Sequence, residues 1–531
     1  MSKKLTYNHT RFDGGMTDDI RNLSDQTKFA YLSHLDIYRD QGSVFTMPGY
    51  VSENGFDGDP EGVKVFDIRA FSFTNFSSVS NSYVMAVANK VDGTGSKLLQ
   101  YKRNNTQWAV PDSGVPAWTV EGDDDVTNRT WLLSPRDTNT GEFYYLTDGS
   151  PISFSGADST RLTRHGSSAT DNVEALADLT RGFTWMNSPE KLIATRGFGG
   201  QLYINGFSNL QEGIARLTTT DLVYERGNSF NFVHDIESGD YQVGYVGNTP
   251  RPTSSQAVLW DTASLLADQN INLGLGRAVV LGYPGNLWTA VMDESLGLVG
   301  GSQFENNGTP SMSIRVLSGE TPETLYRIFA PTNTNGVIET MRGAYRDAMT
   351  WYARIPTNSA GTEFRQGIWA FGKGDIKSQM GASVLLNTEP LGLIENAQWN
   401  GFELWFCHNE DGSVSRLDNF ETGTYDVPAT IETLVYGAQS PYLKQFEGMT
   451  INTSSLPAGG EVTVEYRVDR NTTWQPLSTS DTVGTQRHSF TGTAGESIGR
   501  FQEIQFRITL LGKLELTNIF LEITETDDIP Y

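Results

Sequence analysis

Residues 348–353, AMTWYA, and residues 367–371, GIWAF, are two apolar runs separated by a polar stretch that contains Pro356, Asn358 and Gly361. Each run is short and rich in aromatic side chains, which favour strands over helices. Two such runs joined by a turn-forming segment predict a pair of antiparallel strands.

Six more pairs of this kind occur along the chain, and they recur in units of roughly 40–60 residues, as in a β-propeller. They are residues 83–88 (YVMAVA) with 97–101 (KLLQY), 130–133 (TWLL) with 143–146 (FYYL), 191–195 (KLIAT) with 201–204 (QLYI), 241–245 (YQVGY) with 257–260 (AVLW), 287–291 (LWTAV) with 312–316 (MSIRV), and 402–406 (FELWF) with 413–417 (SVSRL). A small sheet of this size cannot bury both of its faces alone, so neighbouring sheets stack around an axis. We therefore expect an all-β protein with an irregular, roughly seven-bladed β-propeller over residues 71–440. One or two large β-sandwiches with long loops are the alternative.

The two ends of the chain have a different pattern. Over residues 441–531 the runs are longer and alternate strictly between apolar and polar residues, as in 461–468 (EVTVEYRV) and 503–511 (EIQFRITLL). Alternation with period two marks strands that bury one face, so this segment predicts a C-terminal antiparallel β-sandwich. Residues 1–70 lack paired runs, and we expect an N-terminal arm and a segment that closes the propeller.

The composition excludes one class of function. The chain has 531 residues with 39 Lys and Arg against 63 Asp and Glu, a formal net charge of −24. Attraction to nucleic-acid phosphates needs clustered basic residues, so binding of DNA or RNA by charge is not expected. Glycine is abundant, with 54 residues, and predicts many turns. Helical patterns are confined to short stretches at residues 18–29, 172–179 and 260–266.

Neither the single cysteine nor the N-terminus indicates secretion. Cys407 lies in the apolar run LWFC and is expected to be a buried thiol, and one cysteine forms no disulfide within the chain. The first eight residues, MSKKLTYN, contain no apolar signal-peptide core. No apolar run is long enough for a membrane span. We expect synthesis in a cytosol.

The search for catalytic or metal-binding groups yields no set that we assign to a site. The six histidines are scattered without metal-ligand spacing, at positions 9, 34, 165, 234, 408 and 488. Acidic clusters at residues 57–59 (DGD) and 123–125 (DDD) suit either a calcium ion or a solvated loop, and we favour the loop. The expectation is a protein that is not an enzyme, with no catalytic, cofactor-binding or metal-binding residues and no cofactor.

Two short motifs resemble those of sialidases. Residues 469–474 (DRNTTW) resemble the Asp-box turn, with Arg467 and Asn471 departing from its Ser and Gly positions. Arg354, followed by Ile355 and Pro356, resembles a motif that supplies a sialidase arginine. The resemblance implies a propeller glycosidase as a less favoured alternative, and Arg354 as its functional arginine.

A second resemblance covers both ends of the chain. The N-terminal string FDGGM (residues 12–16), followed by LDI (35–37) and MPGY (47–50), is similar to the start of many tailed-phage virion proteins. Residues 464–469 (VEYRVD), with Thr473 and Trp474, resemble the small β-sandwich that ends such proteins.

This second resemblance implies a structural component of a phage tail: a nozzle or hub ring below the portal and adaptor of a short-tailed phage. It would be located in the virion and assembled in the bacterial host cytoplasm. The expected partners are the adaptor or portal ring and the tail fibres or spikes, and the expected assembly is a homo-hexamer without a membrane span. Double-stranded DNA would pass non-specifically, since an acidic wall repels phosphates. A receptor-binding or fibre-like virion protein is the alternative.

Overall fold

The structure is a computed structural model that describes most of the chain. The described residues are 3–40, 42–53, 63–74, 80–90, 96–102, 107–109, 130–137, 142–147, 161–165, 174–178, 194–196, 202–208, 211–217, 222–230, 232–248, 254–263, 269–274, 276–294, 296–299, 303–306, 311–319, 321–329, 337–358, 360–374, 379–391, 394–399, 404–408, 413–454, 460–482, 484–489 and 498–526.

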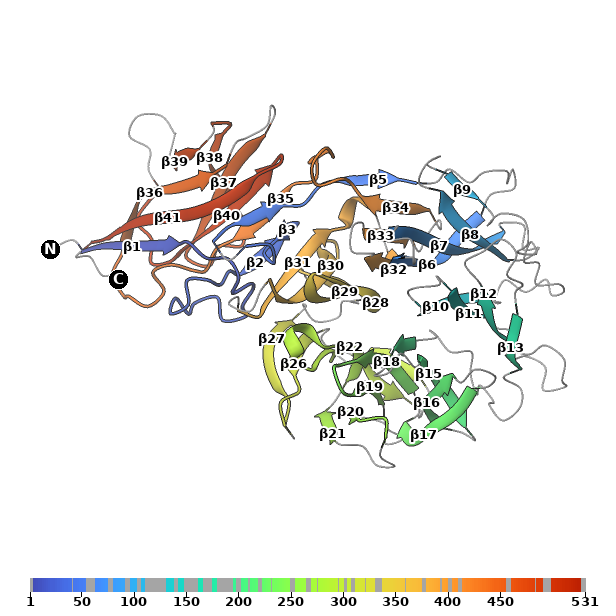
Figure 1. Ribbon diagram of the computed structural model, residues 1–531. Helices are drawn as coiled ribbons and strands as arrows, with labels where there is room; N and C mark the ends of the chain where they lie inside the picture. The colour runs from blue at the N-terminus through green and yellow to red at the C-terminus, as the bar shows by residue number, and fades with distance from the viewer. Residues whose placement is uncertain are drawn as a thin grey trace.

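The predicted all-β propeller fold is confirmed. Within the described residues, seven sets of four strands succeed one another around a ring (Figure 1). The first four are β6 (Val63–Thr74), β7 (Ser80–Lys90), β8 (Ser96–Lys102), β9 (Gln107–Ala109); β10 (Thr130–Asp137), β11 (Glu142–Thr147), β12 (Arg161–His165), β13 (Glu174–Asp178); β14 (Ala194–Arg196), β15 (Leu202–Ser208), β16 (Gln211–Leu217), β17 (Leu222–Phe230); and β18 (Phe232–Ser238), β19 (Val243–Asn248), β20 (Ser255–Trp260), β21 (Gln269–Gly274).

The remaining three sets complete the ring. They are β22 (Arg277–Gly282), β23 (Thr289–Asp293), β26 (Ser311–Val316), β27 (Glu323–Phe329); β28 (Val337–Tyr345), β29 (Asp347–Pro356), β30 (Phe364–Lys373), β31 (Gly381–Asn387); and β32 (Ile394–Trp399), β33 (Leu404–His408), β34 (Val414–Leu417), β5 (Tyr50–Ser52). A hairpin of β24 (Leu296–Val299) and β25 (Gln303–Asn306) is inserted between β23 and β26, and two 3-10 turns are η2 (Pro284–Asn286) and η3 (Glu389–Leu391).

The ring closes through the innermost strands and through an N-terminal strand. The first strand of each set contacts the first strand of the next, and β32 of the last set contacts β6 of the first. The outer strand of the last set is β5, which pairs antiparallel with β34. A segment from the N-terminus thus completes a sheet whose other strands come from residues 394–417.

All seven predicted strand pairs are hydrogen-bonded antiparallel neighbours, each in a different set. The pairs are β7 with β8, β10 with β11, β14 with β15, β19 with β20, β23 with β26, β29 with β30, and β33 with β34. In the pair formed by β29 and β30, Trp351 lies opposite Trp369 and both are fully buried. Their ring centroids are 6.3 Å apart, within the range of stacked aromatic pairs.

The terminal unit, as we call the part beyond the ring, contains two groups of strands (Figure 1). The first group is one sheet of β1 (Lys3–His9), β3 (Leu35–Asp36), β4 (Val44–Thr46), β36 (Lys444–Thr453), β39 (Thr485–His488) and β41 (Glu515–Glu525). The second group is β2 (Tyr31–Ser33), β35 (Ala429–Glu432), β37 (Glu461–Val468), β38 (Gln475–Ser480) and β40 (Ile504–Leu511). Residues 1–70 therefore contribute strands both to the terminal unit and, through β5, to the ring.

One continuous sheet joins the two parts. The second group of the terminal unit continues the set β28–β31 as a nine-stranded sheet, because β2 pairs parallel with β31 at Ser33 and Val384. A single cluster of buried side chains extends from Ile314 of the ring to Leu521 of the terminal unit. The ring and the terminal unit share a core as well as a sheet.

The N-terminal string that resembles phage proteins lies at this junction. Phe12 is fully buried and stacks on Phe29, with ring centroids 5.5 Å apart. The backbone N–H of Met16 donates to the carbonyl of Ala382 over 2.8 Å. Gly15 has φ of +66° and lies so close to β31 that an added Cβ would come within 2.5 Å of the Ala382 nitrogen. The glycine is required here by both conformation and space.

The helices predicted at residues 18–29, 172–179 and 260–266 are wrong as far as the structure describes them. Residues 18–29 form successive turns in which side chains bond the nearby backbone: Asn22 Oδ1 accepts from the N–H of Ser24, and Asp25 Oδ1 from that of Thr27. Such bonds compete with helical ones. Residues 174–178 form β13, and residues 261–263 bend after β20.

Candidate functional site

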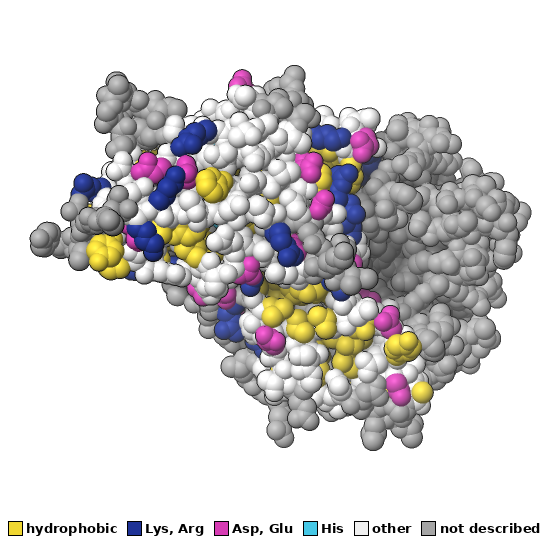
Figure 2. All heavy atoms as spheres, turned by 60° about the vertical axis from the view of Figure 1, so that its left-hand side comes forward, with side chains coloured by type: hydrophobic (Ala, Val, Ile, Leu, Met, Phe, Trp, Pro, Cys, Tyr) yellow, Lys and Arg dark blue, Asp and Glu magenta, His cyan; other side chains and the backbone are white. Residues whose placement is uncertain are grey.

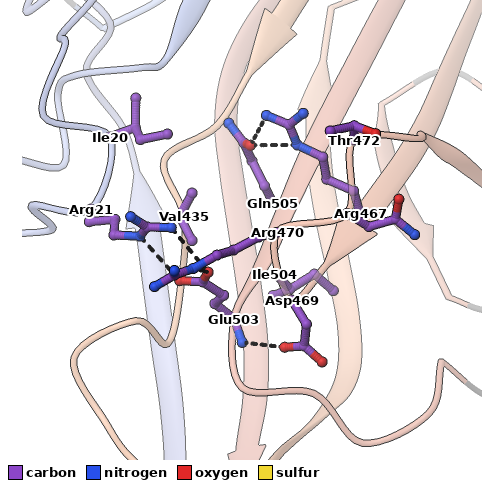
Figure 3. Close-up of a pocket in the computed structure, with 11 residues that line it drawn as sticks. Ile20, Arg21, Val435, Arg467, Asp469, Arg470, Thr472, Glu503, Ile504 and Gln505 are labelled. Atoms are coloured by element: carbon purple, nitrogen blue, oxygen red, sulfur yellow. Dashed lines mark hydrogen bonds and ion pairs between the residues drawn. The ribbon is translucent and has the colours of Figure 1, made fainter.

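A pocket of about 220 Å³ opens on the terminal unit beside the turn that joins β37 to β38 (Figure 3). Segments far apart in sequence meet there: the N-terminal turns, the β37–β38 connection and the start of β40. We call it the arginine pocket, and it is lined by Ile20, Arg21, Val435, Arg467, Asp469, Arg470, Asn471, Thr472, Glu503, Ile504 and Gln505.

The wall of the pocket is a turn with unusual backbone conformation. The N–H of Asn471 donates to the carbonyl of Val468 over 2.9 Å. Between them, Asp469 and Arg470 have φ of +49° and +64°, the left-handed region that favours glycine. The carboxylate of Asp469 accepts the backbone N–H groups of Gln502 (2.7 Å) and Glu503 (3.1 Å), which fixes the turn against β40. Residues held in this region each cost about 1–2 kcal/mol, and such strain is concentrated at functional sites.

Glu503 organises the side of the pocket nearest the N-terminal segment. Its buried carboxylate accepts two bonds from Arg21, Nε to Oε2 over 3.2 Å and Nη2 to Oε1 over 3.1 Å. Nε of Arg470 donates to the same Oε1 over 3.1 Å. One carboxylate thus holds two guanidinium groups, and the side chain of Arg470 remains 76% exposed.

Arg467 is fixed on the opposite side by neutral and aromatic groups. Its Nε and Nη2 both donate to Oε1 of Gln505, over 2.9 and 2.7 Å. Gln505 is only 3% exposed and its Nε2 donates to the carbonyl of Thr433, so the direction of its amide is fixed. The Arg467 guanidinium also stacks on the ring of Trp474, 4.4 Å from the centroid. Burial lowers the pKa of Arg467, with Arg507 and Arg365 adding to that effect.

The row of side chains that supports Trp474 crosses four strands of the nine-stranded sheet. Glu465, Arg507, Glu432 and Tyr31 are successive cross-strand partners on β37, β40, β35 and β2. Arg507 bonds Glu432 over 2.8 Å and stacks on Trp474 at 4.3 Å. The aromatic ring beneath Arg467 is therefore itself held by a charged neighbour.

The side chains of the arginine pocket suit the binding of an anion. It holds three guanidinium groups against two carboxylates, a formal charge of +1 in a chain of −24. Both carboxylates already accept hydrogen bonds that maintain the pocket. The two sialidase-like motifs do not meet in this pocket, because Arg354 lies on β29 and Asp469 follows β37, six strand spacings away in the same sheet. At about 4.8 Å per strand this is about 29 Å.

The turn that resembles an Asp-box is the one that lines the arginine pocket. The aspartate bonds the backbone of another segment, and Trp474 packs under arginines. Sequence reasoning missed Arg21, Glu503 and Gln505, which are remote from the motif along the chain. The signal that was available is the pair of arginines flanking Asp469.

The other candidate residues are dispersed. His9, His34, His234 and His488 are described and lie apart, and the described residues contain no group of three or more His, Cys, Asp or Glu able to hold a metal ion. Arg354 stacks on Phe364, 3.5 Å from the ring centroid. The side chains of Cys407, His165 and His408, and the clusters 57–59 and 123–125, lie outside the described residues.

Comparisons with known proteins give similarity of fold only. No family model matches the sequence, and no curated protein sequence matches it. A catalytically inactive virginiamycin B lyase from Staphylococcus aureus, solved with quinupristin, is 10% identical with a TM-score of 0.38, covering 70% of this chain and 99% of the lyase.

Two other solved structures are similar to the same extent. The Dos1 propeller is 8% identical with a TM-score of 0.34, covering 70% of this chain and 94% of that one. Raptor from Chaetomium thermophilum is 8% identical with a TM-score of 0.37, covering 70% of this chain and 30% of that one. Among the described residues, no helix has the length and apolar character needed to cross a membrane.

Proposed function

We propose that this protein is a structural component of a phage tail, a nozzle or hub ring below the portal and adaptor. In this proposal it has no enzymatic activity, forms part of the DNA exit channel and carries other tail proteins. Its partners are the adaptor or portal ring and the tail fibres or spikes.

The observation that carries the proposal is the junction between ring and terminal unit. The string from Phe12 to Met16, which is one of the stretches that resemble virion proteins, packs against β31 where the two parts meet. Together with the nine-stranded sheet and the shared core, it joins the ring and the terminal unit. A subunit built of two joined parts with different architecture suits a ring that must contact one partner above it and another below.

The acidic composition supports the same proposal. A net charge of −24 spread over the surface repels DNA phosphates, so DNA passes a wall of such subunits without adhering. A cryo-electron microscopy reconstruction of the assembled ring tests this point. Acidic side chains are expected along the channel, and a channel lined mainly by Lys and Arg would contradict it.

The test of the proposal as a whole is the oligomeric state of the purified chain. Mass photometry and negative-stain images are expected to show six-membered rings of about 350 kDa, built from the 58.6 kDa chain. A trimer would support the alternative of a receptor-binding or fibre-like virion protein. A monomer that remains monomeric at high micromolar concentration would overturn the ring.

A fluorogenic sialoside tests the remaining alternative. The proposal predicts no hydrolysis above background. Hydrolysis that is abolished by Arg354→Ala but kept in Arg487→Gln, an exposed arginine on β39, would establish a glycosidase instead.

A further inference from the structure

The edge of Arg467 that faces away from Gln505 has unused hydrogen-bond donors. A guanidinium carries five N–H donors, and here Nε and one hydrogen of Nη2 are directed to Gln505. Within the described residues, no acceptor bonds Nη1 of Arg467. The free edge has the two parallel donors that match a carboxylate.

Arg467 is positioned before any ligand arrives. The Gln505 amide that accepts from Arg467 (Figure 3) is buried and fixed by Thr433, and Trp474 supports the guanidinium face. The charge of Arg467 is not neutralised by the groups that hold it, because Gln505 and Trp474 are neutral. Arg21, by contrast, donates to the carboxylate of Glu503. Little side-chain entropy is lost when such a group binds an anion.

Arg470 supplies a second cation on the side of the pocket where Glu503 lies. It is held to Glu503 through Nε alone, so its two terminal nitrogens have no partner among the described residues. The strained turn is what directs it there, since Arg470 follows Asp469 in the left-handed region. Asn471 and Thr472 add an amide and a hydroxyl at the rim.

We propose that the arginine pocket binds the carboxylate of a small monoanionic ligand, with Arg467 as the anchoring group and Arg470 as the second cation. The pocket volume of about 220 Å³ suits a small ligand. The carboxylates of Asp469 and Glu503 leave a formal charge of +1, which favours a monoanion over the more highly charged phosphate. This site does not depend on the proposed place of the protein in a tail.

Titration calorimetry at low ionic strength tests the site, with glucuronate and N-acetylglycine as probes of a sugar acid and a peptide-like carboxylate. Glucose is the neutral control and inorganic phosphate the competing anion. We expect both carboxylates to bind the unaltered protein, glucose not to bind, and phosphate to bind more weakly. The probe that binds with the higher affinity indicates whether the natural ligand is a sugar acid or a peptide-like carboxylate.

Three variants locate the binding. Arg467→Gln is expected to weaken carboxylate binding about tenfold or more, and Arg470→Gln about threefold to fivefold. Arg487→Gln, an exposed arginine of β39 paired with Glu522, is the matched control and leaves binding unchanged. If Arg467→Gln does not fold, the Arg470→Gln variant, which replaces an exposed side chain, still tests the site. Absence of carboxylate binding, tighter phosphate binding, or equal affinity in the parent and both pocket variants would overturn the proposal.

Discussion

The ring and the terminal unit are both built of β-strands, but they bring together parts of the chain at very different separations. In the ring, each four-stranded set consists of strands that follow one another, with β5 as the exception. In the terminal unit, β1 pairs with β41 from Lys3 opposite Glu525 to His9 opposite Ile519. Local pairing suffices for six of the seven sets of the ring, whereas the last set needs β5 from the N-terminal segment and the terminal unit requires both ends of the chain.

Both regions bury polar side chains that bond other segments. In the ring, buried Asp235 of β18 accepts the backbone N–H of Leu281 of β22 over 2.8 Å. On the terminal unit and the junction, buried charged and polar side chains such as Asp36, Lys444 and Glu432 bond partners from other segments. Figure 2 shows basic side chains spread over the described part of this surface, with acidic side chains beside several of them. At the terminal unit and the junction, specific polar contacts hold together segments that are distant in sequence.

The largest effect is expected from Gly15→Ala at the junction. An added Cβ would lie 2.5 Å from the Ala382 nitrogen and 2.6 Å from its oxygen, on top of the cost of φ +66°. The free energy of unfolding should fall by about 3 kcal/mol or more. Gly319→Ala in the ring is the control, because its φ is +78° with nothing within 4 Å, and it should cost only about 1 kcal/mol. Urea denaturation followed by circular dichroism measures both, and equal losses would contradict the tight junction.

Lys444→Met should destabilise the terminal unit nearly as much. Lys444 is 0% exposed, and its Nζ donates to the carbonyls of Ser440 (3.0 Å), Tyr442 (2.7 Å) and Gln502 (2.8 Å). Methionine fills the space but leaves three carbonyls without that donor, at a cost of about 3 kcal/mol.

The comparison for this variant is Lys513→Met. Lys513 is about half exposed and pairs with Glu421, so its replacement should change stability by less than about 0.5 kcal/mol. Thermal unfolding of the two variants separates them. Similar melting temperatures would show that the Lys444 contacts contribute little.

Acidification should weaken the junction through His34. Burial lowers the pKa of His34 to about 4, from 6.5 in the unfolded chain. The unfolded chain therefore binds the proton first, and stability falls as pH decreases from 6.5 towards 4. Between pH 7 and pH 5 the loss is about 2 kcal/mol for this residue.

His34→Asn isolates that contribution. Asparagine tolerates the φ of +59° at this position and does not titrate. Its stability should decline about 2 kcal/mol less than that of the parent over the same pH interval, measured by urea denaturation at each pH. If stability changed equally with pH in the parent and the variant, His34 would bind a proton as readily in the folded chain as in the unfolded chain.

The smallest effect is expected at the row beside the arginine pocket. Trp474→Leu removes the ring on which Arg467 and Arg507 stack, at 4.4 and 4.3 Å, and should cost about 1 kcal/mol. Thr473→Ala, at the neighbouring exposed position, is the control. Denaturation midpoints that shift equally in the two variants would argue against the stacking.

The sequence allowed the ring to be predicted because its pairing is local. In each of the seven pairs the apolar runs and the turn residues lie within a few tens of residues, as with Trp351 and Trp369. Its patterns also predicted strands close to those observed at β37 and β40. The N-terminal strand β2, which enters the same sheet beside β35, was not predictable, since nothing local relates Tyr31 to Glu432.

The pocket was predictable only in part. The turn at Asp469 was singled out by its motif, but the carboxylate that holds it together with Arg21 belongs to Glu503, 482 residues from Arg21. Such a contact depends on the completed fold. The false helix at residues 18–29 has a local cause, because side-chain bonds such as that of Asp25 to Thr27 replace the helical ones.

The pairing of β1 with β41 and of β5 with β34 has a consequence for synthesis in the cell. The strands β1 and β5 are synthesised before their partners, which follow hundreds of residues later. At about 5–20 residues per second, β1 waits on the order of 25–100 s for its partner. Throughout that time the unpaired edges of the N-terminal strands are open to other chains, so a nascent-chain chaperone or a slow translation rate would have its main effect on this short segment.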